Sequence, residues 1–294
     1  MLSQLTGIVA PVFLLAGLGF AWRRFGFPFE RDFVTRIVMN VSAPCLIVDT
    51  LGGLRLPLRD FLLMLGAAGL FFVISALLAA VALRAMRLSS RSFLPALTFG
   101  NNGNLGLPLA LFAFGEQGLG LAMAVFVFSA VSQFSIVPMF QSQAPALRTL
   151  VTTPVTYGAL LGVALLASDA ALPMGLARGI SMLGSVAIPL MLLALGYSLG
   201  GFRLASIGRA ALLGSLRLLL GLGSALIAAQ LLGLEGLPRQ VLVLQGAMPA
   251  AVFNYLLAAR YQRDPEDVAG IVLVSTCIAL VTTPALLAWL LVQP

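Results

Sequence analysis

The chain has 294 residues, of which 60% are hydrophobic and only 9% are charged, and its mean hydropathy is +1.06. A membrane-spanning helix needs about 20 mostly apolar residues, so this length supplies roughly ten spans with short loops between them and little material for a soluble domain. The composition therefore predicts an all-α polytopic membrane protein.

The polar residues exclude several functions. The chain has no His and no Lys, so its net charge of +7 comes from Arg. A Ser-His triad, a His-bearing zinc protease site and a His proton relay each need a residue that the sequence lacks. The Arg residues are scattered through predicted loops and form no basic stripe with interleaved aromatics, so we expect no nucleic-acid binding. Cys45 and Cys277 lie in apolar segments and indicate neither a disulfide framework nor a metal cluster.

Breaks at charges, Gly/Pro clusters and polar runs divide the chain into apolar segments, which we call spans one to ten. The first has no basic residue before it and Arg23-Arg24 after it, the reverse of a signal peptide, which indicates a retained span. In chain order the spans lie at residues 5–22, 33–53, 60–83, 93–114, 117–140, 150–168, 177–200, 207–232, 239–259 and 267–292.

The distribution of Arg predicts the orientation of these spans. With the N-terminus outside, the predicted inner loops contain eleven Arg and the outer loops contain four. The positive-inside rule then places both termini on the outer side, which is the periplasm if the protein lies in a bacterial inner membrane, as we expect. Two further Arg residues, Arg36 and Arg217, lie within spans.

Proline positions indicate an internal repeat. Ser129 precedes Pro138 by nine residues and Ser275 precedes Pro284 by nine, and LGGLRL at 51–56 resembles LGGFRL at 199–204. We therefore predict two five-span units, residues 1–148 and 149–294, which must be inverted relative to each other because five is odd. Chance coincidence of common membrane prolines is the alternative. The matching prolines, 143 to 146 residues apart, are Pro11 with Pro154, Pro44 with Pro189, and Pro138 with Pro284.

Span four contains an unusual polar run, TFGNNGNLGLP from Thr98 to Pro108, where the bilayer centre should be. Each Gly costs a helix about 1 kcal/mol relative to Ala, and Pro108 removes a backbone donor. Unsatisfied backbone groups at that depth are costly, so a break must be buried in protein or face a wet cavity. The run predicts an interrupted helix. A surface loop between two short hydrophobic hairpins is the alternative.

Span nine carries a corresponding irregularity, QGAMPAAVFN from Gln245 to Asn254. Two broken helices at equivalent places in two repeats indicate a binding site near the membrane midplane. Pro249 alone can simply kink a helix, and Asn254 can equally join two helices. The candidate substrate-binding residues of the two runs are Asn101, Asn102, Gly103, Asn104, Pro108, Gln245, Pro249 and Asn254.

Two ionisable side chains inside spans add to this site. Arg217 lies about ten residues into span eight, near half depth, and is the best candidate for attracting an anion. A structural ion pair or snorkelling toward the inner loop is the alternative. Asp49, near the outer end of span two, could carry a proton, bind a cation or pair with Arg55. Ser129 and Ser275 join Asp49 as candidates for coupling an ion or proton.

These residues also resemble a known family. The string GNNGNLGLPL from Gly100 to Leu109 resembles the fourth-span signature of the auxin efflux carrier family, which includes the PIN-type auxin exporters and proteins described as malonate permeases. The long central loop of many plant members is absent here. The resemblance covers essentially the whole chain, because further matches occur at Phe114-Gly115-Glu116, Gly118-Leu119, Ser42-Ala43-Pro44 and the Val-Ser…Pro pattern ending in Pro284.

The resemblance implies the fold of the bile acid/sodium symporters, in which spans four and nine are broken and cross each other. Spans one, two, six and seven would form a scaffold, and the other spans a transport domain that moves like an elevator. Asn104, Pro108, Pro249 and Asn254 would line the crossover. The implied function is secondary transport of small organic anions such as malonate or auxin-like acids, with no cofactor beyond Na⁺ or H⁺ as a coupling ion. A homodimer through the scaffold helices, surrounded by membrane lipid, is the candidate assembly.

An anion suits this architecture physically. Half-helix N-termini and Asn amides provide donors without a fixed charge that would trap the substrate. Asn and backbone carbonyls could equally coordinate Na⁺, so proton coupling, sodium coupling and uniport remain open. The alternatives are a carrier-fold membrane receptor and a sodium-coupled symporter like those for bile acids. An enzyme is not expected. An intramembrane active site needs paired catalytic groups at one depth, and with no His and only Asp49 as a well-embedded acid the spans offer no such pair.

Overall fold

The computed structural model describes residues 2–53, 57–142, 154–168, 170–200 and 207–292. Within these ranges the regular structure is helical apart from one isolated bridge, so the all-α prediction is confirmed. The helices are α1 (Leu2–Arg24), α2 (Arg31–Ile37), η1 (Val38–Ser42), α3 (Ala43–Gly53), α4 (Leu58–Ala85), α5 (Ser90–Thr98), η2 (Asn102–Gly106), α6 (Leu107–Ser142), α8 (Pro154–Ser168), α9 (Met174–Ser185), α10 (Ala187–Leu199), α11 (Ile207–Leu231), α12 (Gly236–Gly246), α13 (Val252–Arg260) and α14 (Pro265–Val292).

The helices follow the predicted apolar segments. Spans three, eight and ten correspond to α4, α11 and α14, while span two is divided among α2, the π-helical turn η1 and α3. The segment Pro154–Ser168 is apolar but shorter than a usual span. Among the described residues, five segments are long and apolar enough to cross a membrane, namely Leu58–Ala85, Asn102–Gln133, Met174–Ala194, Ile207–Leu231 and Pro265–Val292.

Local sequence explains where several helices begin and bend. The Ser89 hydroxyl caps α5 by accepting the backbone N–H of Ser92 at 3.3 Å. Helix α14 begins with Pro265 followed by two acidic residues, a combination that suits the positive end of a helix dipole. Gly115 has a φ of +66° and bends α6, at the turn that the sequence predicts between spans four and five.

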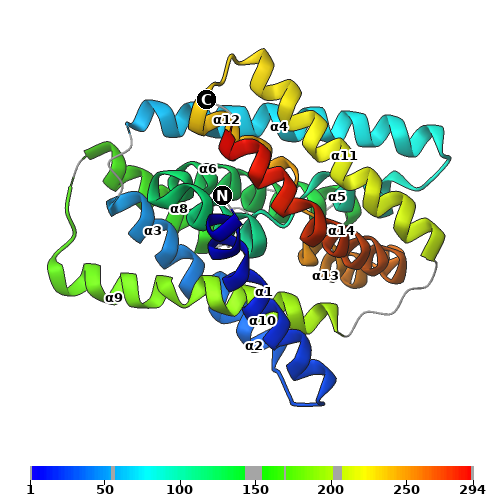
Figure 1. Cartoon of the computed structure of the whole chain (residues 1–294), viewed down its shortest axis with the longest axis horizontal. Helices are drawn as coiled ribbons and strands as arrows, with labels where there is room; N and C mark the ends of the chain where they lie inside the picture. The colour runs from blue at the N-terminus through cyan, green and yellow to red at the C-terminus, as the bar shows by residue number, and fades with distance from the viewer. Residues whose placement is uncertain (1, 54–56, 143–153, 169, 201–206, 293–294) are drawn as a thin grey trace.

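The helices pack in two groups (Figure 1). In the first group, α1 packs on α10, and α3 packs on α8 and α9. In the second group, α11 contacts α4, α12 and α14, while α4 contacts α5 and α6, and α13 contacts α14. Helix α6 also contacts α1 and α3, so it joins the two groups. Figure 1 shows α4 and α11 along one side of the molecule, and α9 and α10 along the opposite side.

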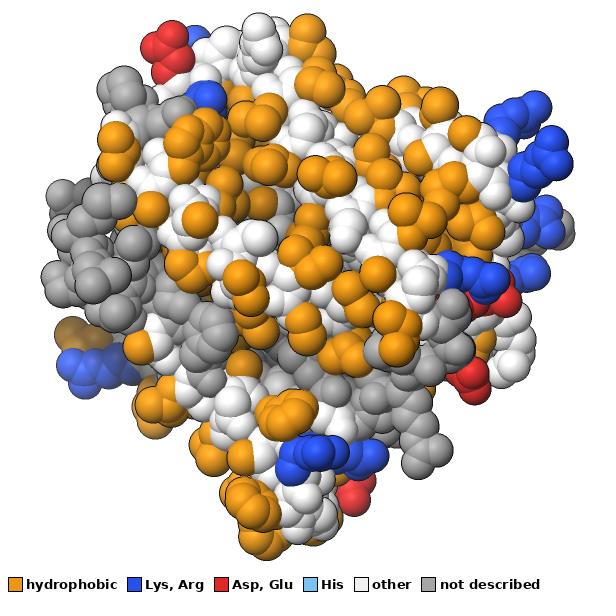
Figure 2. Space-filling model, turned by 45° about the vertical axis from the view of Figure 1, so that its right-hand side comes forward, with side chains coloured by type: hydrophobic (Ala, Val, Ile, Leu, Met, Phe, Trp, Pro, Cys, Tyr) orange, Lys and Arg blue, Asp and Glu red, His pale blue; other side chains and the backbone are white. Residues whose placement is uncertain are grey.

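The outer surface is apolar, as a lipid-embedded protein requires. On α4, exposed side chains such as Val73, Leu77 and Val81 follow one another along the helix. Figure 2 shows hydrophobic side chains across the middle of one face, with Arg side chains gathered near its margins. A continuous apolar surface of this kind is not tolerated in water. The protein is therefore a polytopic integral membrane protein, as predicted.

The inverted repeat remains a prediction. Residues 54–56, which include Arg55, and residues 201–206 contain parts of the two matching motifs, LGGLRL and LGGFRL, and lie outside the described residues. Residues 143–153, where the boundary between the two units is predicted, also lie outside the described residues.

Candidate functional site

Both predicted interruptions are present, and they lie against each other. Helix α5 ends before Phe99 and η2 begins after Asn101, while α12 and α13 are separated by residues 247–251. Gly100 and Ala250 form an antiparallel bridge. The N–H of Asn101 donates to the Pro249 carbonyl at 2.6 Å, and the N–H of Ala251 donates to the Phe99 carbonyl at 3.1 Å. Each break thereby satisfies backbone groups of the other, as burial in a membrane protein requires.

The surface-loop alternative for the first run is wrong, because Gly100, Asn101 and Asn102 are all buried. Asn102 Nδ2 donates to the carbonyl and to Oε1 of Gln245, both at 3.0 Å. The Gln245 carbonyl lies in the last turn of α12, where carbonyls have no partner within the helix. A Cβ at Gly106 would collide with the amide end of the Gln245 side chain, so a larger residue here requires that amide to move. Asn102 and Gln245 thus fasten the end of α12 to η2.

Asn254 joins three elements. Its Nδ2 donates to the Phe99 carbonyl at 2.9 Å, and its Oδ1 accepts from Gln133 Nε2 at 2.8 Å. Asn254 therefore joins helices, which is one of the two roles that the sequence analysis allowed for it. Gln133 was not among the predicted site residues, although it stands four residues after Ser129 and therefore on the same face of α6. That spacing is the signal that could have identified it.

The second break has a partner in α14. Ser275 Oγ accepts the N–H of Ala250 at 3.1 Å and donates to the Val272 carbonyl at 3.2 Å. Pro249 is buried within the break, so it marks an interruption and not a simple kink. Pro108 is buried in the first turn of α6, directly after η2.

Arg217 lies on α11 against the crossover and is 0% exposed, which excludes snorkelling. Its Nη1 donates to the Leu97 carbonyl, in the last turn of α5, at 3.0 Å. A Cβ at Gly100 would collide with Arg217 Nη2. Within the described ranges the guanidinium has no carboxylate partner, and its Nε and Nη2 make no hydrogen bond. The negative end of the α5 dipole offsets only part of this buried charge.

A cavity of about 30 Å³ lies beside the crossover. Asn101 lines it, and the Nδ2 of this residue is buried and has no hydrogen-bond partner in the described part of the chain. A water molecule needs about 10–15 Å³ of such space, so the cavity has room for about two waters or one small ion in this conformation. The lining residues are Gly100, Asn101, Gly103, Asn104, Phe126, Ser129, Ala130, Gln133, Met191, Ala251 and Phe253.

The structure divides the predicted site residues into three sets, two of which lie at the crossover, while Asp49 lies apart. Asn101, Gly103, Asn104 and Ser129 line the cavity. A second set holds the crossover together through backbone and side-chain hydrogen bonds, namely Asn102, Gln245, Pro249, Asn254 and Ser275. Arg217 lies against Gly100 of the first break, and Pro108 lies in the first turn of α6, which follows η2.

Asp49 lies apart from these residues. With Glu116 it lines a separate cavity of about 570 Å³, between α3, α6, α9 and α10. The structure therefore does not bring Asp49 together with the other candidates. Its predicted pairing with Arg55 falls outside the described residues.

Comparison with known proteins identifies the class of this molecule. Residues 5–145 and 139–287 match the family described as membrane transport protein. An uncharacterized transporter of Methanothermobacter thermautotrophicus is 29% identical over 294 residues, which cover 95% of this chain and 96% of that protein. An uncharacterized transporter of Methanocaldococcus jannaschii is 26% identical over 204 residues, which cover 66% of each chain. The family consists of transporters and not enzymes, in agreement with the sequence analysis. The chain therefore belongs to the membrane transport protein family, the auxin efflux carrier family that its sequence resembles, and it is a membrane transporter.

Proposed function

We propose that this transporter is a secondary carrier of small organic anions, carboxylates such as malonate or auxin-like acids, and that it binds them at the crossover of spans four and nine. The observation that carries the proposal is the buried guanidinium of Arg217, which lies against Gly100 without a carboxylate partner among the described residues. An uncompensated positive charge in a low-dielectric interior favours an anionic ligand nearby.

The cavity provides the contacts that an anion needs. At an effective dielectric constant of about 20, a unit charge stabilises a carboxylate about 4 Å away by about 4 kcal/mol, and the effect falls in inverse proportion to the distance. Asn101 Nδ2 is a buried donor without a partner, and Asn104 lies beside it in the first turn of η2. Backbone N–H groups at the start of a helix add partial positive charge. Together these groups recognise a carboxylate without a salt bridge that would slow its release.

The packing of the helices supports an elevator mechanism. The group formed by α1, α3, α8, α9 and α10 corresponds to the scaffold, and the group around α4, α6, α11 and α14 to the transport domain. Met191 of α10 lines the crossover cavity, so a scaffold residue faces the site. Movement of the transport domain past the scaffold would open this small cavity to one side of the membrane. The matching positions of the two breaks support the inverted repeat of residues 1–148 and 149–294.

Sodium-coupled symport is the second candidate, and one observation favours it. The cavity of about 30 Å³ is lined by oxygen-bearing side chains, those of Asn101, Asn104, Ser129 and Gln133. Oxygen ligands suit Na⁺, and in the conformation shown this volume admits a small ion, whereas an organic anion needs the opening described above. The charge of Arg217 opposes a cation at the same place, which is why we rank the anion first.

Uptake by proteoliposomes tests both candidates. Radiolabelled malonate and an indole carboxylate would be offered to purified protein in Na⁺-free and Na⁺-containing buffers, with and without a pH gradient. We expect saturable uptake of a carboxylate in Na⁺-free buffer. Uptake only with Na⁺ would support the symporter, and ligand-induced thermal stabilisation without any uptake would support a receptor. Absence of both uptake and stabilisation across the carboxylate panel would contradict the proposal.

The proposed orientation has both termini outside, in a bacterial inner membrane. It rests on the eleven inner and four outer Arg of the predicted loops. Fusions of alkaline phosphatase and of a fluorescent protein after Pro294 distinguish the two orientations. Of these two reporters, only alkaline phosphatase is active outside the cytoplasm. A fluorescent, phosphatase-inactive C-terminus would contradict the orientation or the ten-span count.

A further inference from the structure

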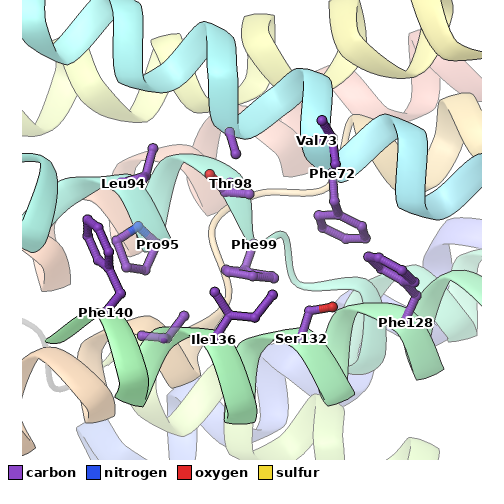
Figure 3. A pocket seen from close by; sticks show the side chains of 12 residues that line it. Phe72, Val73, Leu94, Pro95, Thr98, Phe99, Phe128, Ser132, Ile136 and Phe140 are labelled. Carbon is purple, nitrogen blue, oxygen red and sulfur yellow. The ribbon is translucent and has the colours of Figure 1, made fainter. Parts of the chain in front are cut away.

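The ends of the half-helices α5 and α12 lie close together, because the breaks that follow them pair through the bridge between Gly100 and Ala250. Helix α5 ends at Thr98, and α12 ends at Gly246. Figure 3 shows the end of α5, where Thr98 and Phe99 line an apolar pocket beside α4 and α6. The last carbonyls of a helix have no partner within the helix and carry the partial negative charge of its dipole. Two negative helix ends therefore meet inside the protein.

The guanidinium of Arg217 lies against both ends. Its Nη1 donates to the Leu97 carbonyl, in the last turn of α5, at 3.0 Å. Gly221 stands one turn after Arg217 on α11 and brings in the other end. A Cβ at Gly221 would collide with the Gly246 carbonyl oxygen of α12 and would stand 2.8 Å from Arg217 Nη1. Because Gly221 has no side chain, the last carbonyl of α12 and the guanidinium lie over the same glycine.

Two further oxygen atoms lie beside the same guanidinium, next to Gly100. A Cβ at Gly100 would collide with Arg217 Nη2 and would stand 3.4 Å from both the Met248 carbonyl oxygen and Asn102 Oδ1. Asn102 is 1% exposed, and its Oδ1 has no hydrogen-bond partner in the described part of the chain. A buried oxygen without a hydrogen bond is still attracted to a neighbouring positive charge. Four oxygen atoms of the two broken helices thus gather around one cation.

Oxygen atoms arranged in this way suit a free cation. Carbonyl and amide oxygens are the ligands of hard cations. In transporters with discontinuous helices, unwound carbonyls and the C-terminal ends of half-helices coordinate the coupling ion. In this protein a side chain of α11 supplies the positive charge, and that charge repels a second cation from the same place.

We propose that Arg217 is a tethered cation, whose guanidinium occupies the place between the ends of α5 and α12 where a free cation would otherwise bind. This role goes beyond the proposed function, in which Arg217 attracts the substrate. The two roles are compatible, because the oxygen atoms fix the position of the charge and only Gly100, without a side chain, separates the charge from the cavity. Truncation of Arg217 should therefore create a binding site for a free guanidinium ion.

Thermal denaturation of purified Arg217→Ala tests this role. Guanidinium is the probe, and urea, which has a similar shape and no charge, is its matched control. Burial does not prevent access, since an engineered buried cavity in another protein binds benzene. We expect about 50 mM guanidinium chloride to raise the apparent melting temperature of Arg217→Ala by about 3 °C relative to choline chloride, as a ligand at about ten times its dissociation constant does. Urea should give no rise. Wild-type protein and Arg217→Met, in which the place is filled, should not respond to guanidinium.

Three results would overturn the tethered cation. These are an equal rise in urea, which would mean that any small molecule fills the void, an equal rise in wild-type protein, which would locate the effect elsewhere, and no rise in Arg217→Ala. If Arg217→Ala aggregates on purification, its monodisperse yield after extraction in guanidinium or in urea is the measurement. A higher yield in guanidinium supports the proposal, and equal yields overturn it.

Uptake by proteoliposomes extends the test, and this part rests on the proposed function. Guanidinium in choline buffer should restore most of the carboxylate uptake that Arg217→Ala loses, a loss of about tenfold if anion binding weakens by about 1.4 kcal/mol. Urea should restore none, and equal restoration by the two compounds would overturn the role of the charge. Absence of uptake by wild-type protein would contradict the proposed function, and the melting temperatures would still decide whether Arg217 is a tethered cation.

Discussion

The two interrupted segments differ in sequence but share one backbone arrangement. The first is rich in Asn and Gly, whereas the second contains Pro249 and has no Asn before Asn254. Even so, Gly100 and Ala250 occupy equivalent places in one bridge. An interruption inside a membrane protein therefore needs a partner for its backbone groups, and that partner can be another interruption. Similar side chains are not needed.

The side chains of the two segments also form hydrogen bonds in both directions. Asn102 of the first segment donates to the Gln245 carbonyl of the second, and Asn254 donates back to the Phe99 carbonyl of the first. Once these bonds are made, the first segment still has Asn101 and Asn104 facing the cavity. Under the proposed function, the amides that the crossover does not use are the ones that would contact a ligand. This difference between structural and available amides is what the following substitutions test.

The largest effect is expected from Gly106→Leu, which breaks the contact between the segments. A side chain at this position collides with Gln245 and displaces η2 from α12. Overpacking of this kind costs about 1–3 kcal/mol, and we expect the upper end together with loss of transport. The apparent melting temperature in detergent is the measurement. Gly66→Leu is the control, because Gly66 is exposed on α4 and a Cβ there meets nothing within 4 Å. Equal melting temperatures for the two variants would contradict the contact.

Arg217→Met separates transport from stability. Uptake should fall at least about tenfold, because a difference of about 1.4 kcal/mol in anion binding corresponds to that factor. The melting temperature should stay equal or rise, since removal of an unpaired buried charge offsets the lost bond to Leu97. Arg209→Gln, which alters an exposed ion pair with Asp267, is the control and should leave uptake within about twofold. A variant that melts much lower but transports normally per folded molecule would make Arg217 purely structural.

A double-mutant cycle measures the reciprocal bond directly. Asn102→Ala and Gln245→Ala should each lower the free energy of unfolding by about 1–2 kcal/mol, because each leaves a buried polar group without a partner. In the double variant the effects should overlap, with a coupling energy of about 1 kcal/mol. Urea or thermal denaturation in detergent gives the values. Strictly additive effects would show that the amide pair does not act as a unit.

The sequence predicted the interruptions because Gly, Asn and Pro at bilayer depth disfavour a continuous helix. It could not predict which amides line the cavity, since Asn102 and Asn104 are chemically identical and only the position of α12 distinguishes them. Gln133 was missed because its partner Asn254 lies 121 positions away in the chain, and the bond from Arg217 to Leu97 likewise joins residues 120 positions apart. Asp49 was placed with the site by its depth alone, and the fold separates it by putting α3 in the other packing group.

The smallest effect on stability is expected from Asn104→Ala, and it is the most direct test of the available amides. Asn104 is half-buried at the cavity, whereas Asn102 holds α12. Its removal should change the free energy of unfolding by less than about 0.5 kcal/mol, as for substitutions that break no buried network. Uptake of the carboxylate should nevertheless fall about tenfold or more, because one hydrogen bond to a charged group contributes about 1.5–3 kcal/mol. Asn40→Ala, at an exposed Asn of η1, is the matched control and should alter neither quantity. If Asn104→Ala lowers stability as much as Asn102→Ala while the folded protein transports normally, both amides are structural and the ligand site must lie elsewhere.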